Sequence, residues 1–486
     1  MPSQTTSETS LSYPVPDHRS DWHHGMLAWF AAGILWAISG CARDLSREGG
    51  APAGHASPAT PEHEKAATPE QVRPATPESM CADAPAVVQA EVRAECGPAF
   101  TALDTKHFRL ISDCSPRLSK LMAGSLEQFY VTMHGRFFQA ELTPVRVYVV
   151  EAAADYEPFL ARRGQGPPGG GGFGHYDPRE RVIYSRHFMP DGSESGIGTL
   201  FNLAVHPMLE SDFESPGVPS WIGYGFAAAV EQGRLLNGEW VWGNPNPWRD
   251  AAYRPMFERG AIPPLSAFFA MGSVQFEDDF LINVNTARSI CLWLLLMGDD
   301  KLAAYVESAR TGKGGVDAIE GASGMKLAEV EMSWRDHVRT FQFGGDYVHR
   351  ASKANEEHAL KILAEGAEKH PRYGVLRAEY AKRLLAAGRK DDARREAEAA
   401  LADPRFPLPA LAWNVLLACS KPDDRAGAAR AATAIIGLQP WLEGLEIESY
   451  ETYASLLESD GQALQAAEIK AELARLKLES LPARPR

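Results

Sequence analysis

The sequence of 486 residues lacks several features that would assign it to a specialised class of protein. No apolar run reaches the ~18–20 residues that span a bilayer, which excludes a polytopic membrane protein. Six cysteines in this length are too few for a fold held together by disulfides. Basic residues are also in deficit, because 49 Lys and Arg stand against 63 Asp and Glu. The formal charge of −14 argues against sequence-independent nucleic-acid binding, and we expect no nucleic-acid partner.

Motifs for common cofactors and nucleophiles are missing as well. No Gly-Lys-Ser or Gly-Lys-Thr follows the glycine run at residues 169–172, and the Gly-x-Ser-x-Gly motif of serine hydrolases does not occur. The segment Gly164–Gly169 formally matches Gly-x-Gly-x-x-Gly, but it follows an expected helix and contains two prolines. A dinucleotide loop must instead follow a strand and open a helix, so we expect no cofactor.

What remains has the composition of an ordinary soluble protein, with 45% hydrophobic and 23% charged residues. The one apolar run near the start, Met26–Ala37, has the length of a signal-peptide hydrophobic region. It ends in Ile38-Ser-Gly-Cys41, which resembles the lipobox of bacterial lipoproteins. The resemblance implies that Cys41 is lipidated and becomes the new N-terminus. The alternative is an uncleaved anchor in which Cys41 has no role.

Residues 42–93 are rich in Ala, Pro, Glu, Thr and Ser and repeat the motif Ala-Thr-Pro-Glu at Ala67–Glu70 and Ala75–Glu78. The segment has almost no apolar periodicity, so it cannot bury enough surface to offset the loss of chain entropy on folding. We therefore expect a disordered tether between the membrane and the first domain.

The region 94–343 alternates strand and helix patterns. Short runs rich in β-branched residues predict strands, and apolar residues at helical spacing predict the helices between them. The expected strands are Phe108–Asp113, Val145–Val150 and Arg181–Ser185, and the expected helices cover residues 116–138, 152–163 and 195–209. This order predicts an α+β domain with a small mixed sheet.

Two segments of this region carry a family resemblance. Thr199-Leu-Phe-Asn-Leu-Ala-Val-His206 and Trp221-Ile-Gly-Tyr-Gly-Phe-Ala227 resemble the peptidase MA-like gluzincins, which are bacterial envelope proteins with a thermolysin-like domain. In that family the first helix reads T-L-x-H-E-x-x-H and the second opens W-x-x-E-G-x-A. The histidines and the second glutamate bind zinc, and the first glutamate activates water.

The chain departs from the family pattern where the chemistry lies. Asn202 occupies the position of the first histidine, Leu203 that of the general base, and Tyr224 that of the third zinc ligand. Of the four positions only His206 matches. Neutral Asn and Tyr are poor zinc ligands and Leu cannot accept a proton. We therefore expect no metal and no catalytic residue, and a pseudoenzyme that binds or scaffolds other proteins.

An alternative is a zinc-dependent hydrolase with a relocated site. His206 and Glu210 are four residues apart and would share a helix face, with Asp212 and Glu214 nearby. Pro207 opposes this interpretation, because proline removes a backbone donor and is expected to interrupt the helix.

Residues 351–481 shift to Ala, Leu, Glu, Lys and Arg with helical periodicity. Gly388, Ala393, Ala400 and Pro404 match the tetratricopeptide pattern, and weaker matches lie on either side, at Ala359, Gly366, Pro371, Ala428, Ile435, Pro440, Gly461 and Ala466. The resemblance implies a short helical solenoid whose concave face binds a protein or peptide. The alternative is a helical cap on the central domain.

Two smaller features leave alternatives open. The loop Trp240–Trp248 has aromatic side chains that either stack a sugar or peptide or pack inside the fold. Cys96 and Cys114 flank the start of the domain, and a disulfide between them is one option. Together the observations predict a lipid-anchored protein of the bacterial envelope, at the outer membrane or on the periplasmic face, with a protein partner.

Overall fold

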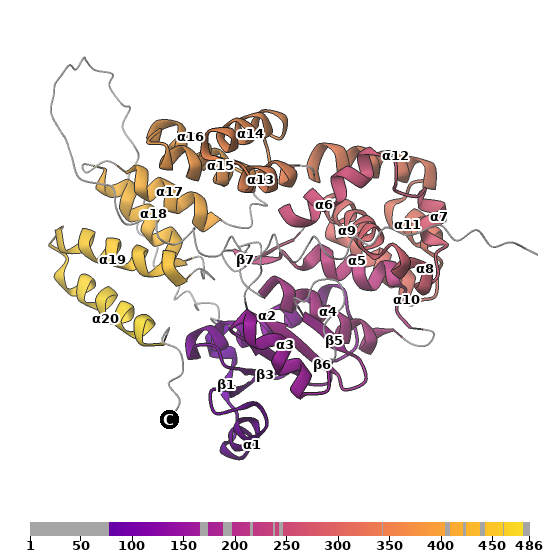
Figure 1. Cartoon of the computed structure of the whole chain (residues 1–486), viewed down its shortest axis with the longest axis horizontal. Coiled ribbons are helices and arrows are strands. Elements are labelled where there is room, and N and C mark those ends of the chain that lie inside the picture. Colours follow the sequence, from indigo (N-terminus) through magenta and orange to yellow (C-terminus); the bar gives the residue numbers. More distant parts are fainter. Residues whose placement is uncertain are drawn as a thin grey trace, which may run out of the picture. The chain divides into compact units, whose positions relative to one another are not determined.

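The computed structural model describes residues 77–165, 174–187, 197–213, 217–236, 239–242, 246–342, 344–403, 409–420, 424–437, 443–459 and 461–479. The expected signal peptide and the lipobox-like segment Ile38–Cys41 lie outside these residues, as does most of the expected tether. The described chain begins with a six-stranded sheet and continues as helices (Figure 1). The prediction of an α+β fold with a small mixed sheet, followed by an all-helical region, is confirmed at this level.

The sheet has the strand order β1-β2-β3-β4-β6-β5. Its strands are β1 (Ala82–Asp83), β2 (Thr101–Asp104), β3 (Phe108–Ser112), β4 (Val145–Val150), β5 (Gly174–Asp177) and β6 (Val182–Arg186). The three strands that the sequence predicted, β3, β4 and β6, form the parallel centre of the sheet. β1, β2 and β5 pair antiparallel outside them, which places β5 at one edge.

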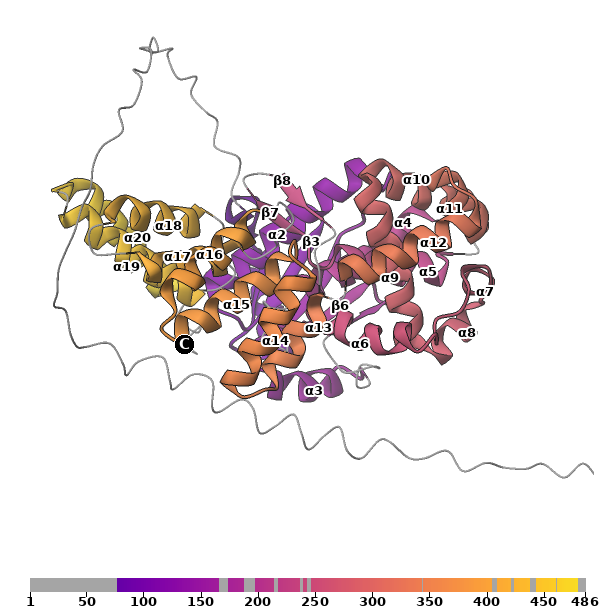
Figure 2. The same cartoon turned by 90° about the horizontal axis from the view of Figure 1, so that it is seen from above.

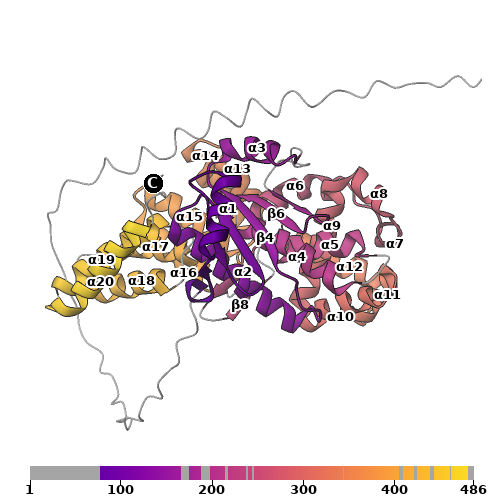
Figure 3. The same ribbon diagram turned by 90° about the horizontal axis from the view of Figure 1, so that it is seen from below.

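Helices cover both faces of the sheet, because its central strands are apolar on both sides. In β4, Val147 and Val149 belong to the larger of two cores and Tyr148 and Val150 to the smaller. The larger core is covered by α2 (Pro116–Arg136) and α4 (Ile197–Asp212), and the smaller by α1 (Ala86–Cys96) and α3 (Ala153–Arg162). Figures 2 and 3 show α2 and α3 on opposite sides of the strands.

The start of the folded region differs from the expectation. Residues 77–93, which the sequence analysis assigned to the tether, form a 3-10 helix (Pro77–Met80), β1 and most of α1. The amide side chain of Gln89 on α1 donates to the carbonyl of Ala102 at 2.7 Å and accepts from its N–H at 3.0 Å. These elements are short and are stabilised by contacts with β2. They can therefore form without a clear apolar periodicity in their own sequence. The expected boundary at residue 94 is therefore wrong.

A helical layer follows the sheet and completes the larger core. It comprises α5 (Ser220–Val230), α6 (Pro247–Glu258), α7 (Leu265–Phe269), α8 (Ser273–Asp278), α9 (Phe280–Met297), α10 (Asp299–Arg310), α11 (Gly315–Ser323) and α12 (Leu327–His337), with a hairpin of β7 (Arg234–Leu236) and β8 (Glu239–Val241). α9 is the one helix in the described chain that is long and apolar enough to cross a membrane, yet 67% of that stretch is buried inside the fold. We interpret α9 as a core helix.

The crossing of α5 and α9 in this layer depends on a glycine. A Cβ added to Gly225 would lie 2.6 Å from the Cβ of Ala287. No real side chain tolerates that separation, so the glycine lets the two backbones approach. Gly225 is one of the residues that carry the family resemblance, and this packing gives it a structural reason.

The tail forms a separate hydrophobic core, which runs from Tyr347 to Cys419, whereas the central core ends at Val338. Its helices are α13 (Gly344–Ser352), α14 (Glu356–Lys369), α15 (Gly374–Ala386), α16 (Lys390–Leu401), α17 (Pro409–Cys419), α18 (Arg425–Gly437), α19 (Glu443–Ser459) and α20 (Ala463–Glu479). Gly388 makes the turn between α15 and α16 with a φ of 77°. Ala393 and Ala400 are fully buried between the helices of the tail.

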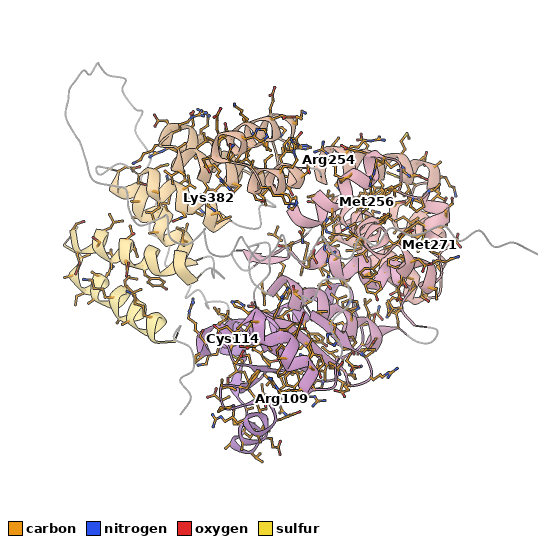
Figure 4. All side chains as sticks on the ribbon, viewed as in Figure 1. Arg109, Cys114, Arg254, Met256, Met271 and Lys382 are labelled. Atoms are coloured by element: carbon orange, nitrogen blue, oxygen red, sulfur yellow. The ribbon has the colours of Figure 1, made fainter. Side chains whose placement is uncertain are left out.

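The tail also packs on the central domain. α13 contacts α6, and the guanidinium of Arg254 on α6 lies 2.7 Å from the carboxylate of Asp346 on α13. Figure 4 labels Arg254 at this junction. At the other end, α20 contacts α2. The first and last helices of the tail are therefore attached to the domain, as the alternative of a helical cap expects.

The cysteines that the structure describes form no disulfide. Cys96 packs on the smaller core, where Arg163 contacts its sulfur at 3.8 Å, whereas Cys114 is buried in the larger core (Figure 4). Because the two side chains face opposite sides of the sheet, a disulfide between them is excluded. Their closeness in sequence suggested a pairing, but the two side chains pack against different cores.

Candidate functional site

Helix α4 carries three of the four positions at which the family resemblance places chemistry. The helix continues without a break to Asp212, so the expectation that Pro207 interrupts it is wrong. Pro207 is itself buried, and packing on both the sheet and α5 keeps the helix intact despite the missing N–H. Asn202 and His206 consequently share one face of α4, and both face α5.

His206 lies between two tyrosines. Its ring stacks on that of Tyr176 from β5, with the centroids 6.3 Å apart and the planes 8° apart. On the other side the ring of Tyr224 from α5 meets it edge to face at 5.7 Å. Burial lowers the pKa of His206 to about 4, so the imidazole is neutral at physiological pH. The structure thus places His206 and Tyr224 side by side, as the family resemblance implies for these two positions.

At the positions of the general base and of the third ligand in the family resemblance, Leu203 and Tyr224 make packing contacts. Leu203 is 7% exposed, and a Cβ added to Gly174 of β5 would lie 2.7 Å from its Cδ1. The leucine therefore fills the space between α4 and the edge strand. The ring of Tyr224 stacks on Phe276 at 5.7 Å and meets Phe280 edge to face at 5.1 Å. Burial and the nearby Glu277 raise the pKa of the Tyr224 hydroxyl, so the phenolate that zinc would need is disfavoured.

Asn202 takes part in a polar cluster that the sequence analysis did not anticipate. Its amide donates to Glu231 Oε2 at 3.2 Å, and Asn246 donates to Oε1 of the same carboxylate at 2.8 Å. Arg249 binds both oxygens, at 2.6 and 2.9 Å. Glu231 is 5% exposed and directly follows α5. In the sequence, the only sign of this cluster is that Glu231 is a charged residue at the end of a strongly apolar helix. The cluster ties α4 to α6 and leaves no free carboxylate oxygen for metal.

A relocated metal site around His206 and Glu210 gains no support. Glu210 Oε2 accepts a hydrogen bond from the hydroxyl of Tyr176 at 2.7 Å. Asp212 accepts from the backbone N–H groups of Gln139 and Ala140, both at 2.8 Å, and Glu214 lies outside the described residues. Across the described ranges, no group of three His, Cys, Asp or Glu side chains is arranged to hold a metal ion.

The first two tryptophans of the aromatic loop pack against the larger core. Trp240 and Trp242 stack on each other at 5.0 Å, and both meet Phe129 of α2 edge to face. Phe129 in turn stacks on Phe201 of α4 at 4.6 Å. These tryptophans fasten the β7–β8 hairpin to α2 and α4. The side chain of Trp248 lies outside the described set.

The most deeply buried charges lie at the junction between the domain and the tail. Arg288 of α9 donates to Asp250 Oδ1 of α6 at 2.8 Å, and the two side chains are 2% and 1% exposed. The hydroxyl of Tyr373, which precedes α15, donates to Asp250 Oδ2 at 3.1 Å. Burial raises the pKa of Asp250, and the neighbouring Arg288 guanidinium offsets part of the increase. The three groups join two helices of the domain to the tail.

Comparisons with known proteins add no relative from which a role could be transferred. No protein-family model matches the chain, and neither a curated protein nor a solved structure matches it significantly. The function must therefore be inferred from the chemistry of the α4–α5 site. That site presents a neutral imidazole between aromatic rings, a leucine, and an amide engaged by a glutamate.

Proposed function

We propose that this chain is a non-catalytic lipoprotein of the bacterial envelope, in which a gluzincin-like domain without a zinc site and a tetratricopeptide-like tail bind a protein partner. The observation that carries the proposal is the filling of the α4–α5 site. Leu203 packs against Gly174 where a general base would stand, and Tyr224 lies in an aromatic stack where an acidic ligand would stand.

The chemistry of these side chains supports a role without catalysis. A catalytic zinc needs three protein ligands and an open position for water. At the matched positions His206 offers one good donor, since the amide of Asn202 is engaged by Glu231. Water activation further needs a group that accepts a proton, and Leu203 cannot. The scaffold can still present a surface, and binding is the function that such a surface supports.

The attachment of the tail supports a single binding body over a loosely tethered pair of domains. The Arg254–Asp346 ion pair and the buried Asp250–Tyr373 hydrogen bond hold its first helices on α6. A partner that binds the tail would therefore be held at a fixed place relative to the α4–α5 site. This arrangement favours a rigid scaffold with two binding surfaces over an adaptor whose two parts move independently.

Capture from native envelopes tests the function. The full chain, cross-linked in the membrane and purified, should retain one protein partner in constant ratio. The same preparation should hydrolyse no peptide from a random library, with or without added zinc. Peptide hydrolysis that is abolished by a chelator and by His206→Ala, with no retained partner, would contradict the proposal and favour the relocated metal site.

The anchor is tested separately. Cys41→Ser should prevent lipidation and leave the precursor unprocessed, because the thiol is the acceptor for diacylglycerol. Inhibition of the lipoprotein signal peptidase should cause the same accumulation in the unmutated chain. Unchanged processing and unchanged membrane fractionation in both experiments would show that Cys41 is not a lipidation site.

A further inference from the structure

One part of the domain surface exposes apolar side chains that its own fold does not cover. Val274 of α8 is 74% exposed, and Phe280 and Leu281 at the start of α9 are 40% and 39% exposed. They are three of the nine large hydrophobic side chains that are exposed in the described chain, and they fall within eight residues. Met271, which precedes α8, marks this edge of the domain in Figure 4. Clustered exposed apolar groups are typical of interaction sites.

Three carboxylates lie among these apolar side chains. Glu277, Asp278 and Asp279 are all exposed. Within the described ranges they form no ion pair, in contrast to the tail, where exposed carboxylates such as Glu357 and Glu365 pair with lysines one helical turn away. We name the six residues the α8–α9 surface: Val274, Glu277, Asp278, Asp279, Phe280 and Leu281.

Aromatic rings extend from this surface to the α4–α5 site. Phe280 meets Tyr224, Tyr224 meets His206, and His206 stacks on Tyr176 of β5. His206 is neutral at physiological pH, so it adds no positive charge that would repel a cation. A positive side chain is present at the far end of the row, where Arg181 donates to Ser211. The acidic charge is therefore concentrated at the α8 end, beside Phe280.

We propose that the α8–α9 surface binds a polypeptide segment of a partner protein that carries basic residues next to apolar ones. The inference rests on the proposed binding function and assigns it a surface and a partner chemistry. Unpaired carboxylates attract Arg and Lys, aromatic faces add cation–π attraction, and Val274 and Leu281 cover the apolar neighbours. A second copy of this chain is a poor occupant, because each carries a formal charge of −14. An anionic membrane is repelled for the same reason.

The experiment uses two fluorescent peptides and two matched variants of the full chain. One peptide alternates arginine and leucine, and in the other glutamate replaces arginine. The test variant is Val274→Ser with Asp278→Asn, one exposed aliphatic and one carboxylate four residues apart on α8. The control is Met332→Ser with Asp336→Asn, the same spacing on α12, where Met332 is 70% exposed. Neither variant touches the core, so both should fold.

The arginine peptide should bind the unmutated chain, with an affinity that falls as salt is added. The test variant should weaken it about tenfold while the control variant leaves it unchanged. Equal binding of the two peptides, or equal loss in both variants, overturns the inference. Binding to anionic phosphatidylglycerol vesicles that is lost in the test variant overturns it in favour of a membrane. If the inference fails while the full chain still retains its envelope partner, the proposed function stands and the surface is wrong.

Discussion

Two helix junctions of the same domain differ in the side chains that they bury. Where α4 crosses α5, the positions expected to hold ligands and a base carry Leu203, a neutral His206 and the ring of Tyr224. Where α6, α9 and the tail meet, the fold buries Asp250 and Arg288 and adds the hydroxyl of Tyr373. A buried charged pair thus lies at the joint between the domain and the tail. We conclude that its role there is to fix how the tail sits on the domain.

The comparison predicts the largest loss of stability at the tail junction. Asp250→Leu leaves the Arg288 guanidinium buried without a counter-charge and Tyr373 without an acceptor. Removing one partner of a buried pair costs about 3–5 kcal/mol in the free energy of unfolding. Urea denaturation measures this loss in the free energy of unfolding. The exposed pair Lys361–Glu357 is the control, since Glu357→Gln should cause no measurable change. A loss for Asp250→Leu no greater than for this control would contradict the account.

A smaller loss of stability is expected when the tail residue of the same cluster, Tyr373, is changed. Tyr373→Phe removes the hydrogen bond to Asp250 while keeping the ring in place. A hydrogen bond to a charged group contributes about 1.5–3 kcal/mol, and the free energy of unfolding should fall by that amount. Hydrogen exchange in α15 should also accelerate, because the hydroxyl attaches this helix to the domain. Unchanged exchange would mean that the tail is held by its other contacts.

The pH dependence probes the α4–α5 site. The pKa of His206 is about 4 in the folded chain and about 6.5 when exposed in the unfolded chain. Well above pH 6.5 His206 is neutral in both the folded and the unfolded chain, so it does not contribute to the pH dependence of stability. Between these values the unfolded state binds a proton that the folded state does not, so stability falls as the pH falls. His206→Phe keeps a ring and should flatten this part of the stability–pH curve. An unchanged slope would show that His206 is not buried as described.

The smallest effect is expected for a second Tyr→Phe substitution. The hydroxyl of Tyr224 has no hydrogen-bond partner within the described chain, and its ring makes the contacts with His206, Phe276 and Phe280. Tyr224→Phe should therefore change the free energy of unfolding by no more than about 0.5 kcal/mol. Tyr224→Phe and Tyr373→Phe each remove one phenolic hydroxyl. The difference between their effects on the free energy of unfolding therefore compares the two junctions directly. Equal losses at the two sites would remove the difference between the junctions.

The sequence predicted the elements whose signal is local. β3, β4 and β6 are runs of β-branched and aromatic residues, and α2 and α4 have apolar residues at helical spacing. It missed β1, β2 and β5, because strands of two to four residues are defined by their partners. It also extended the tether through α1, whose alanine-rich sequence is stabilised by contacts with β2.

The α4–α5 site could be predicted only in part, because only its local motifs carry a signal in the sequence. The framework around Trp221 and Gly225 located the helix pair, and the structure brings His206 and Tyr224 together between these helices. Glu231 and Asp250 were missed, because a buried charge has the same appearance in sequence as a surface charge. Their partners come from other helices, and Tyr373 lies 123 residues beyond Asp250. Long-range partners of this kind have no signal in a single sequence.

The most direct test of the account is the zinc content of the full chain before and after the missing groups are restored. The unmutated chain should carry no stoichiometric zinc after dialysis. Asn202→His with Tyr224→Glu should bind one equivalent, because Asn202 and His206 share the face of α4 that meets Tyr224, and Leu203→Glu in addition should give peptide hydrolysis. One equivalent of tightly bound zinc in the unmutated chain, lost together with a peptidase activity on His206→Ala, would contradict the central claim.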